Sequence, residues 1–448
     1  MYKVNELISE KLVAHIWQQQ LVADLITDSG DKVCTNFPGR ACNDGGGDFC
    51  DAILTIGNKT IRGNVEVHVR SSQWYSHGHH LDSNYNNVVL HVVMWHDYQT
   101  ATILQNGNSI PTIQLWHYLT YPLGELNRRI RLAYSFLPTC PKAYGCFDYK
   151  VLVGVLGAAG EKRFISKVAV FQKSLTQENA GQVFFRNISR ALGYDKNTSS
   201  FKQLADMLPL ETLEQIGGDG RGSIHQALII GTAGLLPSQR RHLKYAVNED
   251  SVVTELETIW KKRKITRTMN QNDWHFFRVY PYNFPTRRLV ALGYLVSRYY
   301  AAGLLQSILG LVRESPPKHA YQRIEEGLIV PAQGYWANHI DFGITTARSV
   351  ALLGQNKAAE IAVNIVLPFA YAWGEVFADP KLQEKALATY LNYPKLGGNN
   401  LIRFMSQQLL IRPDLNLSAV QQQGLIHIFK NYCRQRNCLG CPIVINQM

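Results

Sequence analysis

The sequence DFCDAILTIGNKTIRGNVEVHVR occupies residues 48–70. Phe49–Ile56 and Thr60–Arg70 are rich in β-branched and apolar residues and predict two strands, which the turn residues 57–59 join into a hairpin. Valine and polar residues alternate along the second strand, as Val65-Glu-Val-His-Val-Arg70. A period of two gives a strand one apolar and one polar face, so this segment predicts a sheet with a polar face near residue 66.

Around this hairpin the sequence predicts the rest of an α/β domain. Glu6–Val22 has apolar residues at helical spacing, and residues 43–48 form a glycine-rich loop that ends at Asp48. Val88–Trp95 is a nearly continuous apolar run, which is typical of a strand buried on both faces. Further short strands are expected at Gln99–Leu104, Thr112–Leu115 and Lys150–Val155.

From about Glu161 the chain changes to long segments with helical periodicity. They are Glu161–Leu175, Asn179–Gly193, Phe201–Leu208, Gln226–Leu236, Leu289–Val312, Lys357–Trp373, Lys381–Leu391 and Ala419–Tyr432. Gly157–Gly160 resembles a linker, so we expect an α/β domain with a mixed sheet at residues 1–158 and a mostly helical domain at 159–448. The predicted fold class is therefore α+β.

The charge of the chain favours a polyanionic partner. The 448 residues carry a net charge of +12. Residues 1–100 hold 7 Lys/Arg and 11 Asp/Glu, and the remaining residues hold 39 Lys/Arg and 23 Asp/Glu. Acidic residues that hold a metal beside a basic body that holds phosphates would explain this division, although ordinary variation in charge would produce it as well. The expected partner is nucleic acid.

Two further features concern the location of the protein. Residues 1–20 contain Lys3, Glu6, Glu10 and Lys11 and so lack the apolar centre of a signal peptide. Ile361–Gly374 is the nearest approach to a membrane span and is too short. We expect a cytoplasmic protein without a membrane partner, in which clustered cysteines indicate metal binding rather than disulfides.

An ordered set of short motifs resembles the bacterial domain-of-unknown-function family 2851. The motifs are Gly46-Gly-Asp-Phe49, Gly63-Asn-Val-Glu-Val-His68, Ser71-Ser-Gln-Trp74, His77-Gly-His79, Asp82, Tyr85, Asn87–Val93, Ala227–Leu235, Arg278–Pro285, Tyr335-Trp336, Asn364–Pro368 and Tyr432–Cys441. Gly47 is a departure, because the family pattern usually has proline there. The family has no assigned activity, so the resemblance implies a fold and leaves the function to the residues.

The N-terminal part also resembles the restriction-endonuclease-like nuclease fold, in which an Asp opens one strand and a Glu-x-Lys follows on the next. Asp48 and Glu66 match the two acids, and His68 stands in place of the lysine. Hydrolysis of a phosphodiester requires carboxylates that converge on Mg²⁺ or Mn²⁺, and residues two apart on a strand share one face. We therefore expect Asp48 and Glu66 to bind the ion, His68 to assist the attacking water, and His79 and Asp82 to support them. The alternative is an ordinary solvent-exposed polar face.

Cys433, Cys438 and Cys441 lie within nine residues of one another. Three thiolates at this spacing suit zinc or an iron–sulfur cluster, both of which take four ligands. Cys140 is the expected fourth ligand, with Cys146 and His427 as alternatives. Plain reduced thiols are the other interpretation.

A third group combines arginine with aromatic residues. Arg278, Arg287 and Arg288 flank a segment that contains Asn283 and three aromatic side chains. Arginine with interleaved aromatic rings suits phosphate contact and base stacking. A buried arginine that locks two helices together would give the same pattern.

The residues together predict a metal-dependent phosphodiesterase that acts on DNA or RNA. Two alternatives stay open: a non-catalytic nucleic-acid-binding protein that keeps the nuclease fold, and a metal-dependent hydrolase of a small molecule. The sequence contains no P-loop, no dinucleotide fingerprint and no Gly-x-Ser-x-Gly motif, so it gives no support for nucleotide hydrolysis of the P-loop type, nicotinamide chemistry or serine hydrolysis.

Overall fold

The fold was analysed in a computed structural model, which describes residues 8–20, 22, 24–42, 46–98, 100–119, 149–194, 196–217, 222–240, 250–263, 265, 267–276, 279–409, 416–435 and 437–445. Contacts divide the chain into two compact units. Unit 1 comprises Met1–Ala159, Gly398–Asn416 and Gly424–Met448, and unit 2 comprises Gly160–Gly397 and Leu417–Gln423. The division of the sequence at residue 158 stays a prediction about domains.

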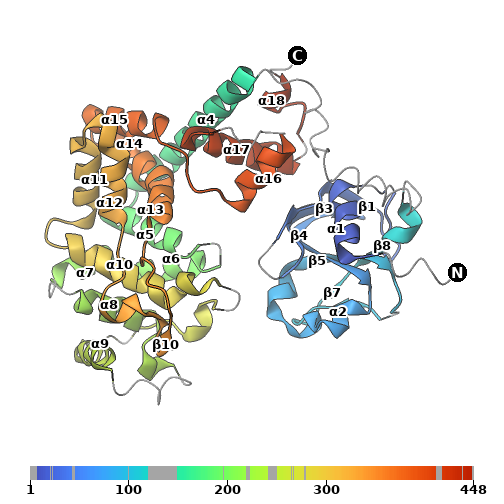
Figure 1. The fold of residues 1–448 in the computed structure, drawn as a ribbon, viewed down its shortest axis with the longest axis horizontal. Coiled ribbons are helices and arrows are strands. Elements are labelled where there is room, and N and C mark those ends of the chain that lie inside the picture. The colour runs from blue at the N-terminus through green and yellow to red at the C-terminus, as the bar shows by residue number, and fades with distance from the viewer. Residues whose placement is uncertain are drawn as a thin grey trace. The chain divides into compact units, whose positions relative to one another are not determined.

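Unit 1 is built on a mixed sheet (Figure 1). Its strands lie in the order β1 (Val33–Phe37), β3 (Phe49–Ile56), β4 (Lys59–Arg70), β5 (Val88–Trp95) and β8 (Thr112–Gln114), and β2 (Arg40–Ala41) pairs with β3. The pairs β1–β3 and β3–β4 are antiparallel, whereas β4–β5 and β5–β8 are parallel. The predicted hairpin and the buried strand at 88–95 are confirmed, and so is the α+β fold class.

Helix α1 (Glu10–Gln19) packs against β4 and β5. Its side chains Val13, Ile16 and Trp17 are fully buried, and they share one apolar core with Val65 and Val67 of β4. Burial of large apolar side chains stabilises such a contact by roughly 1.5–3 kcal/mol each. The valines of the alternating segment therefore attach the first helix to the centre of the sheet.

The segment between β4 and β5 forms a second small layer of unit 1. It contains α2 (Gln73–Ser76) and two 3₁₀ turns, His79–Leu81 and Ser83–Asn87. Trp74, Tyr85 and Val88 form a separate core with Leu104 and Ile110, which lie at the small hairpin of β6 (Thr102–Ile103) and β7 (Ser109–Ile110). The His-rich segment 72–87 is thus an ordered, packed structure in unit 1.

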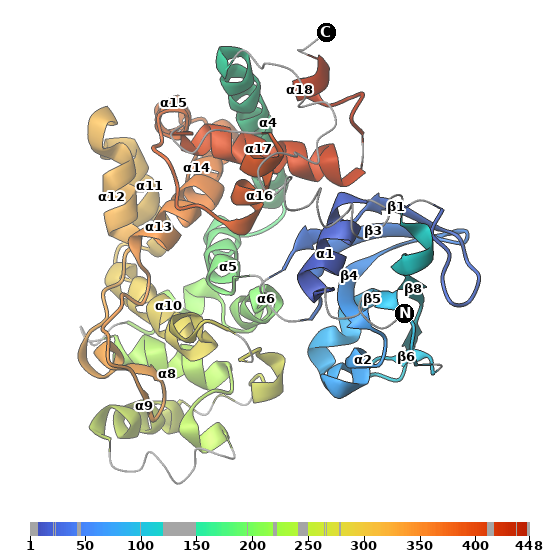
Figure 2. The ribbon, with the colours of Figure 1, turned by 45° about the vertical axis from the view of Figure 1, so that its right-hand side comes forward.

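Unit 2 is helical, as Figure 2 shows. Its helices are α5 (Ala180–Leu192), α6 (Thr198–Met207), α7 (Leu210–Gln215), α8 (Ser223–Thr232), α9 (Ser251–Lys262), α10 (Pro285–Tyr299), α11 (Leu304–Glu314), α12 (Ala320–Leu328), α13 (Gln355–Ile361), α14 (Leu367–Val376) and α15 (Pro380–Leu391), with a π-helical turn at Ala362–Val366 and a short hairpin of β9 (His339–Asp341) and β10 (Ile344–Thr345). One continuous apolar core joins these helices, with α14 against α15, α11 against α12, and α8 in contact with α9 and α10.

Helices α4 (Tyr149–Leu175) and α17 (Ala419–Asn431) carry residues of both units, and unit 1 also contains α16 (Asn400–Gln408) and α18 (Pro442–Ile445). The strand predicted at Lys150–Val155 is wrong, because these residues belong to α4. Its buried residues Leu152, Leu156 and Ala159 recur at helical spacing.

The segment expected to be a linker, Gly157–Gly160, also lies within α4. A Cβ atom on Gly160 would lie 2.1 Å from the carbonyl oxygen of Val420. The glycine therefore permits a close approach of two segments and does not provide flexibility.

The helix predicted over Leu289–Val312 is divided into α10 and α11. Gly303, the N-cap of α11, has a φ of +81°, a backbone conformation that favours glycine and lets the chain turn between the two helices. No single helix among the described residues is long and apolar enough to cross a bilayer. Taken together, α10 and α11 reach that length and apolarity, but they are bent by 74° relative to each other.

Candidate metal centre

Strand β4 provides the first two side chains of the site. Glu66 and His68 lie two residues apart on the strand and are 6 % and 1 % exposed. The polar face of β4 is therefore buried at this point, in contrast to the solvent-exposed face that alternation alone suggests. A charged carboxylate and an imidazole buried side by side require polar partners, which the next segment of the chain supplies.

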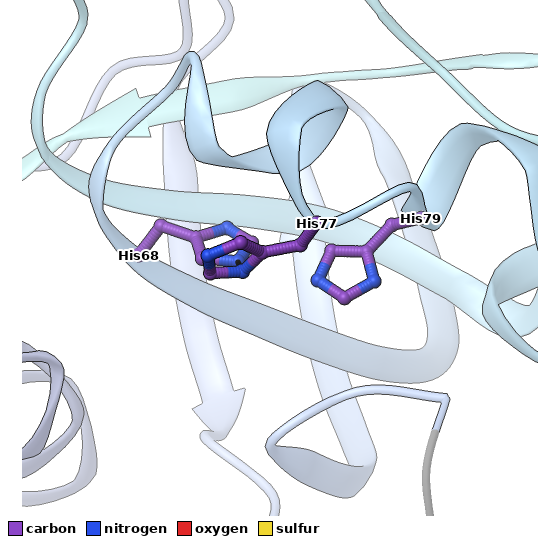
Figure 3. Close-up of side chains that lie close together, drawn as sticks. All are labelled: His68, His77 and His79. Atoms are coloured by element: carbon purple, nitrogen blue, oxygen red, sulfur yellow. Dashed lines mark hydrogen bonds between the residues drawn. The ribbon is translucent and has the colours of Figure 1, made fainter.

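Two further histidines approach from the segment after α2 (Figure 3). His77 follows α2, and Gly78, with a φ of +74°, turns the chain so that His79 points to the same place. His68 Nε2 lies 3.2 Å from His77 Nδ1, and His79 Nε2 lies 3.2 Å from Glu66 Oε1. Ligand atoms of the three histidines all lie within 4.8 Å of one another, the single such group of three or more donors within the described part of the chain.

Asp48 approaches from the loop that precedes β3. Its Oδ2 accepts a hydrogen bond of 3.0 Å from the backbone N–H of Val67, the neighbour of Glu66. Gly47, with a φ of +121°, makes this possible, since a Cβ there would lie 2.9 Å from the Cβ of Asn64. Partial burial and the charge of Glu66 raise the pKa of Asp48 to about 7, although Asp48 keeps an exposed surface. The two acids predicted to converge thus lie close enough to repel each other.

The structure adds two residues that the sequence did not single out as members of the site. Glu10, in the first turn of α1, places Oε1 4.0 Å from His68 Nε2 and accepts a hydrogen bond from Gln73. His91 of β5 lies 2.9 Å from His68 through its Nε2 and 3.1 Å from the hydroxyl of Thr102 through its Nδ1. Helical spacing places Glu10 on a helix but does not reveal where that helix packs. His91 lies in an apolar strand, so the sequence suggests a core histidine, and it is fully buried as well as bonded to His68.

The two most deeply buried histidines of the site are neutral. Burial, together with the neighbouring imidazoles, lowers the pKa of His68 to about 2 and that of His91 to about 3. A neutral imidazole has a nitrogen lone pair that can bind a metal ion. The site also has three carboxylates beside its three clustered imidazoles, and together they form a donor set for a divalent cation. The carboxylates are those of Glu10, Asp48 and Glu66, and the imidazoles are those of His68, His77 and His79.

Asp82 has a different local role. It is the N-cap of the 3₁₀ turn Ser83–Asn87, and its Oδ1 accepts hydrogen bonds from the backbone and the side chain of Asn84. These bonds fix the turn that places Tyr85 against His79, with ring centroids 3.9 Å apart. Asp82 therefore acts on the site through the backbone of the His-rich segment.

The arginines of unit 2 lie in a helix core. Arg287 is fully buried and donates to the carbonyl oxygens of Trp336, His339 and Val350. Arg288 donates to the carbonyl oxygen of Leu352 and to Oδ1 of Asn283. Arg278 lies outside the described residues. This arrangement matches the alternative stated above, in which buried arginine ties helix α10 to the segments packed on it.

The C-terminal cysteines lie around a short turn after α17. Cys433 and Cys438 are partly buried and Cys441 is buried. Cys140 and Cys146 lie outside the described residues, and among the described ones the three sulfurs do not form a close group of donors. Cys42 and Cys50, which the sequence left unassigned, are joined by a disulfide that closes the loop carrying Asp48.

The model of the family described as Protein of unknown function (DUF2851) matches residues 10–397. The chain belongs to this family. The matched part of this DUF2851 protein contains every residue of the metal centre described above and ends before Cys433. No curated protein and no solved structure matches the chain. The chemistry must therefore be argued from the geometry of the site.

Proposed function

We propose that this DUF2851 protein hydrolyses phosphodiester bonds of DNA or RNA with a divalent ion, Mg²⁺ or Mn²⁺, held by Asp48 and Glu66. One observation carries the proposal. The Asp48 carboxylate, at the end of the loop before β3, accepts a hydrogen bond from the backbone N–H of Val67, so it lies beside Glu66 of β4 and next to a group of imidazoles. A carboxyl group whose pKa is raised by burial and by a neighbouring acid, as that of Asp48 is, is typical of metal and catalytic sites.

The order of elements supports the same proposal. A helix is followed by three antiparallel strands, β1, β3 and β4, and then by a strand parallel to the last of them, β5. This order resembles the core of the restriction-endonuclease-like fold. Asp48 stands at the start of β3 and Glu66 within β4, which are the positions of the two acids in that fold.

The chemistry assigns a role to each group. When bound, a divalent ion neutralises charge on the phosphate and favours the attack of water. Water then forms a bond to phosphorus, the ester bond to the leaving oxygen breaks, and the proton of the water passes to a nearby base. Glu10 is an exposed carboxylate whose Oε1 lies 4.0 Å from His68 Nε2, and it can accept that proton.

The basic remainder of the chain favours nucleic acid as the polyanion. Its excess of 16 positive charges outside residues 1–100 would attract phosphates, and each contact would add about 0.9 to the slope of log affinity against log salt. We keep the cytoplasmic location, and zinc or an iron–sulfur cluster at Cys433, Cys438 and Cys441, as parts of this proposal.

The test is a cleavage assay on the full chain, with single- and double-stranded DNA and RNA in Mg²⁺ or Mn²⁺. Glu66→Gln removes one charge and keeps the size of the side chain. Asp51→Asn is the matched control, because Asp51 lies three residues from Asp48 and binds Arg40 and Arg62 instead of the site. We expect cleavage that the control keeps and Glu66→Gln loses. Salt-dependent binding without cleavage would instead support the non-catalytic alternative, and neither activity would support a small-molecule substrate.

A further inference from the structure

The imidazole group has a geometry that the phosphodiesterase proposal alone does not require. We propose that Glu66, His68, His77 and His79 form a four-donor site for a transition-metal ion of the Zn²⁺ class, with a strong preference over Mg²⁺. This inference rests on the same site as the proposed function and names the class of ion that it holds.

The types of donor atom set the preference. Mg²⁺ takes six oxygen ligands and keeps several of them as water, whereas zinc and its neighbours in the first transition row accept imidazole nitrogen. The site offers three nitrogens and one carboxylate oxygen, a set found in zinc proteins. A Mg²⁺ ion would be held by the carboxylate oxygens alone and would not use the three imidazole nitrogens beside them.

The distances between donors agree with this assignment. With metal–ligand bonds of 2.0–2.1 Å, the edges of a tetrahedral zinc site are about 3.3–3.4 Å long. Donor pairs of the site are separated by 3.2 Å (His68 Nε2 and His77 Nδ1), 3.2 Å (His79 Nε2 and Glu66 Oε1) and 3.6 Å (His68 Nε2 and Glu66 Oε1). Small shifts of the side chains would therefore suffice to surround an ion.

A chain of buried hydrogen bonds orients His68 for this role. If Nε2 of His68 carries the lone pair for the ion, its Nδ1–H donates to His91 Nε2 at 2.9 Å. His91 then donates from Nδ1 to the hydroxyl of Thr102 at 3.1 Å, and Thr102 to the hydroxyl of Thr112 at 2.9 Å. Each histidine then carries its proton on Nδ1, and these two tautomers satisfy every hydrogen bond of the chain. Such partners behind a metal ligand fix its ring and raise its basicity.

The remaining donors are also held in place by packing. The His79 ring lies between Trp74, at 5.3 Å, and Tyr85, at 3.9 Å between ring centroids. Glu66 and His68 both pair with β5, opposite His91 and Val93, so the parallel ladder holds their backbone. The negative charges of Glu66, Asp48 and Glu10 repel one another and would be offset by a bound cation.

The test is metal binding by the full-length protein, measured by equilibrium dialysis against Zn²⁺, Mn²⁺ and Mg²⁺ with elemental analysis. Because the C-terminal cysteines are also proposed to bind metal, the relevant quantity is the ion lost on substitution. We expect His77→Ala and His79→Ala each to lose one Zn²⁺ per chain, or to weaken its binding on the order of 100-fold or more. His80→Ala is the matched control, since His80 is the sequence neighbour of His79 and its ring packs on Tyr75.

A second pair of variants tests the orienting chain and keeps the ligands intact. Thr102→Val should weaken Zn²⁺ binding by up to about 10-fold, the lower end of the effect of losing a direct partner of a metal ligand, because Thr102 acts on His68 through His91. Thr35→Val is the control, because Thr35 is a buried threonine of the same sheet whose hydroxyl has no hydrogen-bond partner among the described residues. The thermal midpoint of each metal-free variant checks that it is folded.

The outcomes separate this inference from the proposed function. Unchanged Zn²⁺ binding in both histidine variants, or Mg²⁺ bound as tightly as Zn²⁺, would overturn the inference even if the protein cleaves nucleic acid. Zn²⁺ binding that requires His77 and His79, in a protein that cleaves no nucleic acid, would retain the inference and remove only the nuclease proposal.

Discussion

Replacing Asp48 with asparagine should stabilise the metal-free protein above neutral pH and weaken its metal binding at the same time. Asparagine keeps an oxygen that can accept the hydrogen bond from Val67 but cannot carry the charge that repels Glu66. The pKa of Asp48 is raised to about 7 in the folded chain, from its ordinary value of 3.8. Between these two values the folded state keeps a proton that the unfolded state has released.

The sign and size of the effect follow from this difference. As pH rises from about 4 to 7, the wild-type protein loses stability, because the unfolded chain ionises first and is favoured; above pH 7 the loss is complete. The difference between 3.8 and about 7 corresponds to about 4 kcal/mol. Asp48 is exposed on one side, so solvent screening reduces the expected loss to about 1–2 kcal/mol. The Asp48→Asn variant avoids this loss, so relative to the wild type it should gain this amount at about pH 8 and nothing at about pH 4.

The assay is urea unfolding of both proteins in EDTA from pH 4 to pH 8, with the difference in the free energy of unfolding plotted against pH. Taking the difference cancels the other titrating groups. Asp51→Asn is the control, and its effect should have the opposite sign. Burial alone would raise the pKa of Asp51, but Arg62 and Arg40 hold that pKa below its usual value. The Asp51→Asn variant should therefore be less stable than the wild type above pH 4. Saturating Mn²⁺ at 100 times its dissociation constant should stabilise the wild type by about 2.7 kcal/mol and the Asp48 variant by less. A difference that does not change with pH would refute the proposed repulsion.

Three other substitutions probe features near and far from the site. Gly47→Ala should lower cleavage about 100-fold and also weaken metal binding, because a displacement of Asp48 on the order of 1 Å can reduce a rate by that factor; the cleavage assay and dialysis measure the two effects. Asp341→Asn should destabilise unit 2 by about 3–5 kcal/mol in urea unfolding, because it leaves the buried Arg240, 2.8 and 2.9 Å from its two oxygens, without a counter-charge. Loss of the Cys42–Cys50 disulfide by Cys42→Ser should cost about 2–3 kcal/mol, from the loop closed by a sequence separation of 8 residues.

Each of these has a matched control. Gly30→Ala introduces the same positive-φ strain in open space, so an equal loss of metal binding there would contradict the role of Gly47. Asp206→Asn breaks pairs with Arg186 and Lys202 that are partly exposed, and it should cost at most about 1 kcal/mol. Cys34→Ser, at an exposed cysteine, should leave stability unchanged.

Local periodicity in the sequence determined the strands of unit 1 well. The bounds of β3 and β5 coincide with Phe49–Ile56 and Val88–Trp95, because an apolar run between turn residues has few other stable arrangements. The same rule failed at Lys150–Val155, where valines that favour a strand continue into a helix whose buried positions recur every three or four residues. Local preference was overridden there by packing over a longer segment.

The arginine-rich segment shows the same limit for function. Arginine beside aromatic residues is equally suited to phosphate and to backbone carbonyls, and its sequence pattern is identical in both cases. Only the tertiary structure decides that Arg287 and Arg288 donate to carbonyl oxygens in the core of unit 2.

The sequence by itself predicted the hairpin of β3 and β4, with Asp48 immediately before it and Glu66 and His68 on one face of its second strand, since strand pairing and the period of two are local properties. It named His79 as a supporting residue, but it did not determine that Glu10, His77 and His91 lie beside them. Those contacts depend on where α1 packs and on how Gly78 turns the chain between two imidazoles. They are long-range consequences of burying Trp74 and the valines of β4, and so only the tertiary structure brings these side chains together.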